Sequence, residues 1–148
     1  MKNIYYSGLL ALVLSFSSCE KFDEGGFVSK ADERIIGTWK LEKYLRNGSD
    51  ETTTLYISNL QEVYQSGGTM IRTFNEKDSD LNTDDATYEF TSDQKELKIS
   101  GVSSIGDFSS NINSVSSSSL TIVKLYKNEF WYKYTNGSDV HEFHFKKQ

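Results

Sequence analysis

The amino-acid sequence predicts an all-β domain, and three observations support that prediction. Aromatic residues make up 14% of the chain, and flat side chains of this kind pack well on the pleated surface of a sheet. The chain has no proline, but Asn47-Gly48 and Asn136-Gly137 are dipeptides that strongly indicate tight hairpin turns. Apolar and polar residues alternate between such turns, as in strands with one face in the core and one in water.

Eight short strands account for this alternation. The pattern is clearest at Tyr88 and Phe90, which flank a charged residue, and at Phe143 and Phe145 near the C-terminus. Since local turns join successive strands, we expect an antiparallel meander, and eight strands can close into a barrel without exposed edges. A two-sheet β-sandwich is the alternative. The expected strands are 39–45, 52–58, 69–74, 87–91, 96–100, 120–126, 129–134 and 140–146, with one helical turn over residues 32–36.

The N-terminal residues have the pattern of a cleaved signal peptide. Lys2 precedes the apolar run Gly8–Leu14, and the small residues Ser17 and Ser18 stand directly before Cys19. The apolar run is shorter than the roughly 20 residues that a membrane span requires. Cys19 is the only cysteine, so an intrachain disulfide is excluded. This ending resembles the lipobox of bacterial lipoproteins, which implies that Cys19 is acylated and becomes the new N-terminus.

The chain therefore divides into a signal peptide (1–18), a lipidated cysteine with a flexible tether (19–31) and a β domain (32–148). The tether begins with the acidic, glycine-containing segment Glu20–Gly26. This segment resembles the export signals that carry some lipoproteins of the Bacteroidota to the cell surface. We expect an outer-membrane protein held by its lipid, facing the periplasm or the cell surface.

Three segments of the domain resemble lipocalin-like domains. Gly37-Thr38-Trp39 matches their G-x-W opening, and the segments 122–132 and 142–147 resemble the last hairpins of lipocalin-like lipoproteins of the Bacteroidota. The resemblance covers residues 34–146 and implies an eight-stranded antiparallel barrel with Trp39 at its closed end. It also implies binding of a small apolar ligand. The chain departs from classical lipocalins in having no disulfide and in the serine-rich stretch 102–119.

The alternation turns a set of apolar side chains toward the interior of this barrel. They are candidates for lining a ligand cavity, and they fit a filled hydrophobic core equally well. In the second case the protein is an accessory or structural surface protein that binds a partner protein or glycan with its outer face, where Trp131 is expected. The candidates for the interior are Trp39, Leu41, Tyr88, Phe90, Phe130, Tyr132, Phe143 and Phe145.

One acidic segment matches a calcium-binding loop at every position but one. The template D-x-[DN]-x-[DN]-G-x₅-E requires a glycine where this chain has Thr83. The flanking segments are expected strands rather than helices, which favours a solvated acidic hairpin loop instead. The matching residues are Asp78, Asp80, Asn82, Asp84 and Glu89.

Composition and spacing give no support to catalysis, a cofactor or nucleic-acid binding. His141 and His144 are three residues apart on an expected strand, so their side chains point to opposite faces and cannot share a metal ion. The chain has no G-x-S-x-G nucleophile motif. Without residues 1–18 it carries 15 basic and 21 acidic residues, and an acidic domain without a basic stripe binds phosphate backbones poorly. We therefore expect a non-catalytic protein.

Overall fold

The computed structural model describes residues 30–54, 57–76, 81–101 and 117–148. The expected signal peptide, Cys19, nearly all of the tether, and residues 102–116 lie outside these ranges. None of the helices in the described ranges has the length and apolar character needed to cross a bilayer. The boundaries proposed for the leader and the tether remain predictions.

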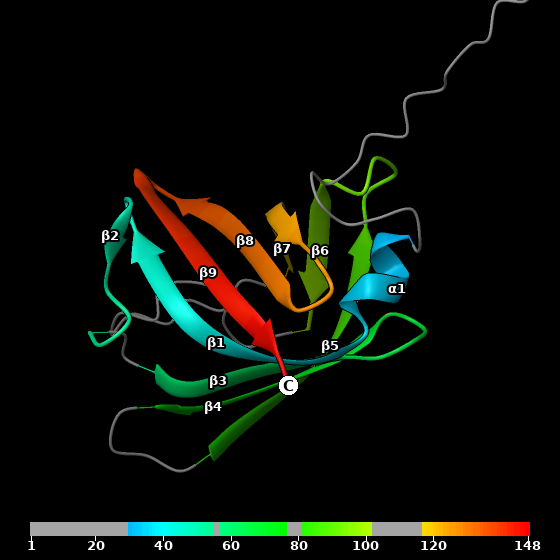
Figure 1. Ribbon diagram of the computed structural model, residues 1–148, viewed down its shortest axis with the longest axis horizontal. Helices are drawn as coiled ribbons and strands as arrows, with labels where there is room; N and C mark the ends of the chain where they lie inside the picture. The colour runs from blue at the N-terminus through cyan, green and yellow to red at the C-terminus, as the bar shows by residue number, and fades with distance from the viewer. Residues whose placement is uncertain (1–29, 55–56, 77–80, 102–116) are drawn as a thin grey trace, which may run out of the picture.

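The described residues form one short helix and a continuous antiparallel sheet that closes on itself (Figure 1). Neighbouring strands pair in chain order, and the last strand, β9, pairs with β1. The two-residue strand β2 pairs only with the end of β1. This closed eight-strand barrel confirms the predicted fold class and excludes the two-sheet sandwich. The elements are α1 (Ala31–Ile35), β1 (Gly37–Arg46), β2 (Ser49–Asp50), β3 (Ile57–Tyr64), β4 (Thr69–Glu76), β5 (Leu81–Phe90), β6 (Glu96–Ser100), β7 (Ser117–Leu125), β8 (Glu129–Asn136) and β9 (Asp139–Lys147).

Two of the predicted strands were placed wrongly. Residues 52–54 form a turn instead of opening the second strand, and β3 runs over 57–64. β5 begins at residue 81, six residues before the predicted start. In each strand a charged residue, Glu62 in β3 and Asp84 in β5, occupies an inward position where the alternation requires an apolar residue.

The helix α1 covers the end of the barrel at which β1 begins. Its Ala31 and Ile35 side chains are fully buried. The indole nitrogen of Trp39 donates a hydrogen bond of 2.6 Å to the carbonyl of Ile35, and the Arg34 guanidinium donates one of 3.2 Å to the carbonyl of Leu125. The helix is thereby joined to the first and the seventh strands, and Trp39 lies at the closed end as the G-x-W pattern implies.

Candidate functional site

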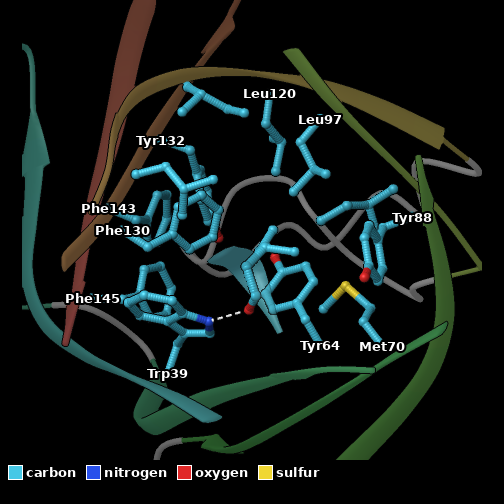
Figure 2. Close-up of a cluster of buried hydrophobic side chains, with 14 of the residues drawn as sticks. Trp39, Tyr64, Met70, Tyr88, Leu97, Leu120, Phe130, Tyr132, Phe143 and Phe145 are labelled. Carbon is cyan, nitrogen blue, oxygen red and sulfur yellow. Dashed lines mark hydrogen bonds between the residues drawn. The ribbon is translucent and has the colours of Figure 1, made fainter. Parts of the chain in front are cut away.

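The barrel interior is the first candidate for a site, and the predicted lining residues all belong to it. Figure 2 labels six of them and shows the rings of Trp39, Phe130, Tyr132, Phe143 and Phe145 gathered on one side of the interior. The ring centroid of Phe130 lies 5.6 Å from that of Trp39 and 5.4 Å from that of Tyr132. Contacts this close identify these side chains as core that fills the closed half of the barrel. Trp39, Tyr88, Phe130, Tyr132, Phe143 and Phe145 are buried, whereas Leu41 and Phe90 are partly buried and pack against the others.

A charged pair lies inside the barrel next to this aromatic core. Glu62 of β3 and Arg72 of β4 are both fully buried. The Arg72 Nη2 and Nε atoms lie 2.6 and 3.1 Å from one oxygen of Glu62. The hydroxyls of Tyr64 and Tyr132 donate to the same carboxylate, at 2.7 and 3.0 Å. The carboxylate thus has the hydrogen bonds that a buried charge requires.

This network fixes the protonation of its two tyrosines and its arginine. Burial, together with the charge of Glu62, raises the pKa of the Tyr64 and Tyr132 hydroxyls well above the ordinary value. Burial alone would lower the pKa of Arg72, but the attraction of Glu62 together with the contributions of Tyr132 and Tyr64 outweighs it, and the pKa is raised. The tyrosines therefore stay neutral donors and the arginine stays a cation.

The inward face at the other end of the barrel carries polar aromatic side chains. The Tyr44 hydroxyl and His141 Nδ1 are 2.7 Å apart, and the rings of His141 and Tyr134 stack with centroids 4.9 Å apart. His144 points outward from the same strand, as the spacing predicts. His141 and His144 therefore cannot bind one metal ion. Among the described residues no group of three or more His, Cys, Asp or Glu side chains could hold one.

A pocket of about 550 Å³ opens at the edge of the closed end, and we call it the α1 pocket. It lies between α1 and the turns that follow β3 and β5. Two of the predicted lining residues, Tyr88 and Phe90, are among its walls, and Ile36 adds a third apolar side chain. Three carboxylates, those of Asp32, Glu33 and Glu89, also line it.

Hydrogen bonds between the walls hold the α1 pocket in shape. The Ala31 backbone nitrogen donates to Gln94 Oε1 at 3.2 Å, which ties α1 to the turn after β5. The Tyr88 nitrogen donates to the carbonyl of Gly68 at 2.7 Å. A side chain at Gly68 would place its Cβ 3.0 Å from the Tyr88 carbonyl oxygen, and the φ of +84° at this position also favours glycine. These contacts fix the positions of α1 and of the two turns relative to β5.

Comparison with solved structures places this barrel among known folds. The chain superposes on a lipocalin-like protein from Bacteroides uniformis with a TM-score of 0.59 and 16% identity, over 78% of this chain and 99% of that one. An uncharacterized protein from Bacteroides eggerthii gives a TM-score of 0.53 at 13% identity, over 77% and 99%. The fold is that of the lipocalin-like barrels.

A more distant lipocalin-like barrel is apocrustacyanin C2, with a TM-score of 0.50 and 14% identity over 78% of this chain and 61% of that one. No protein-family model and no curated protein matches the sequence. Since all three identities are low, the similarity concerns the fold, and the site has to be argued from this chain's own residues.

The outer wall of the lipocalin-like barrel carries a second concave feature. The strand registers place Lys124, Trp131, His144 and Lys43 in one row across β7, β8, β9 and β1. The rings of Trp131 and His144 are almost parallel, with centroids 3.9 Å apart, and the Lys124 ammonium lies 4.3 Å from the Trp131 ring centroid. Trp131 thus points outward, as predicted, and contacts hold it in one orientation.

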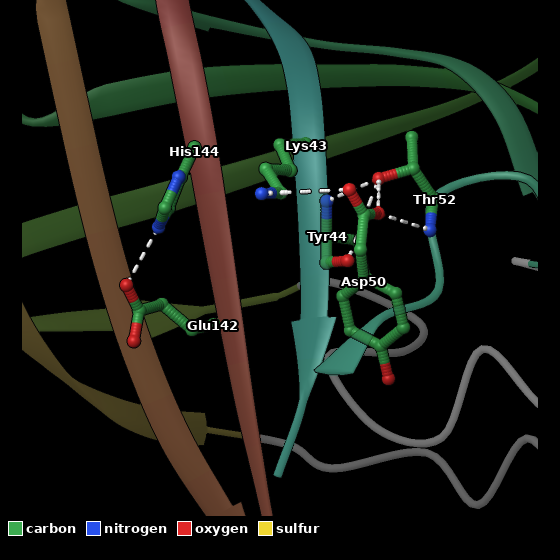
Figure 3. Close-up of polar contacts among 6 residues, drawn as sticks. All are labelled: Lys43, Tyr44, Asp50, Thr52, Glu142 and His144. Carbon is green, nitrogen blue, oxygen red and sulfur yellow. Dashed lines mark hydrogen bonds and ion pairs between the residues drawn. The ribbon is translucent and has the colours of Figure 1, made fainter. Parts of the chain in front are cut away.

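We call the hollow beside this row the outer groove, which measures about 420 Å³. Figure 3 shows its polar contacts. Asp50 accepts hydrogen bonds from the Thr52 nitrogen at 3.1 Å and hydroxyl at 2.7 Å, and pairs with Lys43 at 3.4 Å. These contacts, those of Thr52 above all, lower the pKa of Asp50. The outer groove therefore keeps a carboxylate and an ammonium side by side on its wall.

The calcium-loop hypothesis is wrong for the residues that the structure describes. Asn82, Asp84 and Glu89 all belong to the extended strand β5. At about 3.3 Å per residue, Asn82 and Glu89 are roughly 23 Å apart and cannot bind one ion. Asp78 and Asp80 lie outside the described residues. The error arose because the segment was interpreted as a loop, although Asp84 stands directly opposite Arg72 in the β4–β5 ladder.

The buried ion pair provides a direct test of how the barrel is held together. Arg72→Met leaves the Glu62 carboxylate buried without its cation, and we expect it to lower the free energy of unfolding by about 3–5 kcal/mol. Adding Glu62→Gln removes the second charge but keeps an acceptor for the two tyrosine hydroxyls. We expect the double variant to regain at least about 1 kcal/mol relative to the sum of the single effects, measured by urea unfolding. Strict additivity would contradict a direct coupling between these side chains.

Proposed function

We propose that this protein is a lipid-anchored, non-catalytic binding protein of the outer membrane, and that its small-molecule site is the α1 pocket. The observation that carries the proposal is a cavity of sufficient volume whose wall is partly aromatic. The volume of about 550 Å³ lies within the roughly 300–1,000 Å³ of ordinary ligand sites. Tyr88 and Phe90 supply an apolar wall, and the polar rim can orient a ligand.

The packing of the barrel favours this location over the barrel centre. Phe130 and Phe143 are 0% exposed, so a ligand at their level would have to displace well-packed rings. Deleting such contacts costs several kcal/mol. Phe90 is only partly buried, and a ligand in the α1 pocket would cover it without disturbing the core.

The anchor rests on the N-terminal sequence. Several acyl chains on Cys19 would bind a membrane firmly, at about 0.8 kcal/mol per buried CH₂. The acidic charge of the domain gives no electrostatic attraction to anionic lipid, so attachment would depend on the lipid alone.

A second candidate function uses the outer wall. The outer groove combines Trp131 with carboxylate, hydroxyl and ammonium groups, and amphipathic aromatic residues of this kind are common in contacts with partners. In this alternative the protein is an accessory surface protein that binds a partner protein or a glycan, and the barrel interior is plain core.

The ligand site is tested with the mature chain, residues 19–148, carrying Cys19→Ser so that no lipid competes. We expect 4-phenylbutanol to bind, and Phe90→Ala to weaken its affinity about tenfold, since part of a buried ring contact is lost. Ligand-observed NMR titration measures both. Leu81→Ala is the matched control, because Leu81 is a 62% exposed side chain of the same strand and does not line the α1 pocket. Equal losses in the two variants would refute the site.

The anchor is tested in cells of the native host. Cys19→Ser in the full precursor should abolish incorporation of a labelled fatty acid and release the protein from the outer-membrane fraction. An unchanged membrane fraction would refute the lipid anchor. Protease added to intact cells then distinguishes the two faces, since only a surface domain is digested.

The outer groove is tested by tryptophan fluorescence. The chain has two tryptophans, and Trp39 is fully buried, so a ligand in the outer groove should change the emission of Trp131 alone. Surface polysaccharide purified from the host is the probe. We expect a titratable change that Trp131→Phe abolishes if the second function holds, and no change if the protein acts only through the α1 pocket.

A further inference from the structure

The charged side chains that line the α1 pocket all have the same sign. The carboxylates of Asp32, Glu33 and Glu89 line it, and the described lining residues include no lysine, arginine or histidine. Asp32 and Glu33 follow one another on α1 and are exposed to solvent at its rim. A pocket whose charged groups all have one sign attracts ligands of the opposite sign and repels the others.

Only one of the three rim carboxylates has a cationic partner among the ion pairs of the described residues. Glu89 lies 3.5 Å from Lys98, and the two side chains are 71% and 53% exposed. Exposed pairs of this kind contribute little and are easily exchanged for another partner. Most of the negative charge at the rim is therefore available to a ligand.

The wall beneath these carboxylates is aromatic. The Tyr88 hydroxyl already donates a hydrogen bond of 2.8 Å to the carbonyl of Gln65, so its proton is engaged within the protein and its ring is left as the apolar part of the wall. Phe90 is arranged edge-to-face with Tyr88, with ring centroids 6.3 Å apart. Aromatic faces attract cations through their quadrupole, and more strongly where water is excluded.

The carboxylates and the rings act on the same space. Burial raises the pKa of the Tyr88 hydroxyl, and the negative charge of Asp32 adds to that increase. The field of Asp32 therefore reaches the aromatic wall. Anionic ligands would meet repulsion from the rim, and uncharged ligands would use only the rings.

We propose that the α1 pocket binds a small organic cation, an amine or quaternary ammonium group on an apolar body, with the cationic group between the Asp32 and Glu33 carboxylates and the rings of Tyr88 and Phe90. This inference rests on the proposed function of the pocket, and it names the class of ligand. It places the apolar body against Phe90 and Ile36 and the charge toward the rim.

Three probes that share one body separate the charge preference from binding itself. They are 4-phenylbutyltrimethylammonium, 4-phenylbutanol and 4-phenylbutyrate, titrated by ligand-observed NMR into the mature chain with Cys19→Ser. We expect the cation to bind at least tenfold more tightly than the alcohol and the carboxylate to bind most weakly. The preference should shrink as salt is raised from 10 to 500 mM, because screening weakens charge attraction at the exposed rim.

Variants assign the preference to the rim. Asp32→Asn with Glu33→Gln should bring the affinity of the cation close to that of the alcohol and leave the alcohol unchanged. Glu51→Gln with Asp85→Asn removes the same charge from residues that do not line the pocket, and should preserve the preference. Equal binding of all three probes would overturn the cation proposal and leave the proposed function standing. Failure of all three to bind would overturn both.

Discussion

The closure of the sheet by β1 and β9 is the constraint on which the rest of the structure depends. Seven residue pairs from Trp39↔Lys147 to Arg46↔His141 join the first strand to the last, with one irregularity between Leu41 and Lys43. Closure removes the free edges of the sheet. It also fixes the volume into which every second side chain must fit, because strand number and stagger determine the width of a barrel.

That fixed volume explains where the protein has room for a ligand. The closed half is filled by rings such as Trp39 and Phe130, and α1 seals the end beneath them. Space is left where elements of different type meet, because a short helix cannot follow the curvature of a strand. In Figure 1, α1 lies beside the end of β5, and residues of both elements line the α1 pocket. A lipocalin-like barrel can therefore offer a site beside its core without opening the core itself.

Local alternation accounts for what the sequence could predict. Strands with alternating apolar residues, such as Phe143 and Phe145 in β9, were found close to their true positions, and so was Trp39 beside the helical turn. Six predicted core rings are buried and the outward positions of Trp131 and His144 are correct. These features depend on local alternation, which one sequence contains.

The errors concern residues whose partners lie on another strand. Glu62 can be buried only because Arg72 neutralises its charge and the hydroxyls of two tyrosines donate hydrogen bonds to its carboxylate. Nothing in the neighbourhood of Glu62 along the chain indicates this, and the predicted second strand, 52–58, ended before it. The α1 pocket escaped prediction for the same reason, since Asp32 and Tyr88 are 56 residues apart in the chain.

The buried ion pair and the acidic rim show how one fold gives charge two different roles. Inside the barrel the cost of removing Glu62 from water has to be offset by protein groups, and four hydrogen bonds to its carboxylate do so. At the rim Asp32 and Glu33 keep their hydration, so their charge need not be neutralised by the protein. Charge that the protein leaves uncompensated beside an aromatic wall is what a cationic ligand can neutralise. The difference in burial, rather than the number of carboxylates, is therefore what separates the structural Glu62 from Asp32 and Glu33, which we propose bind the ligand.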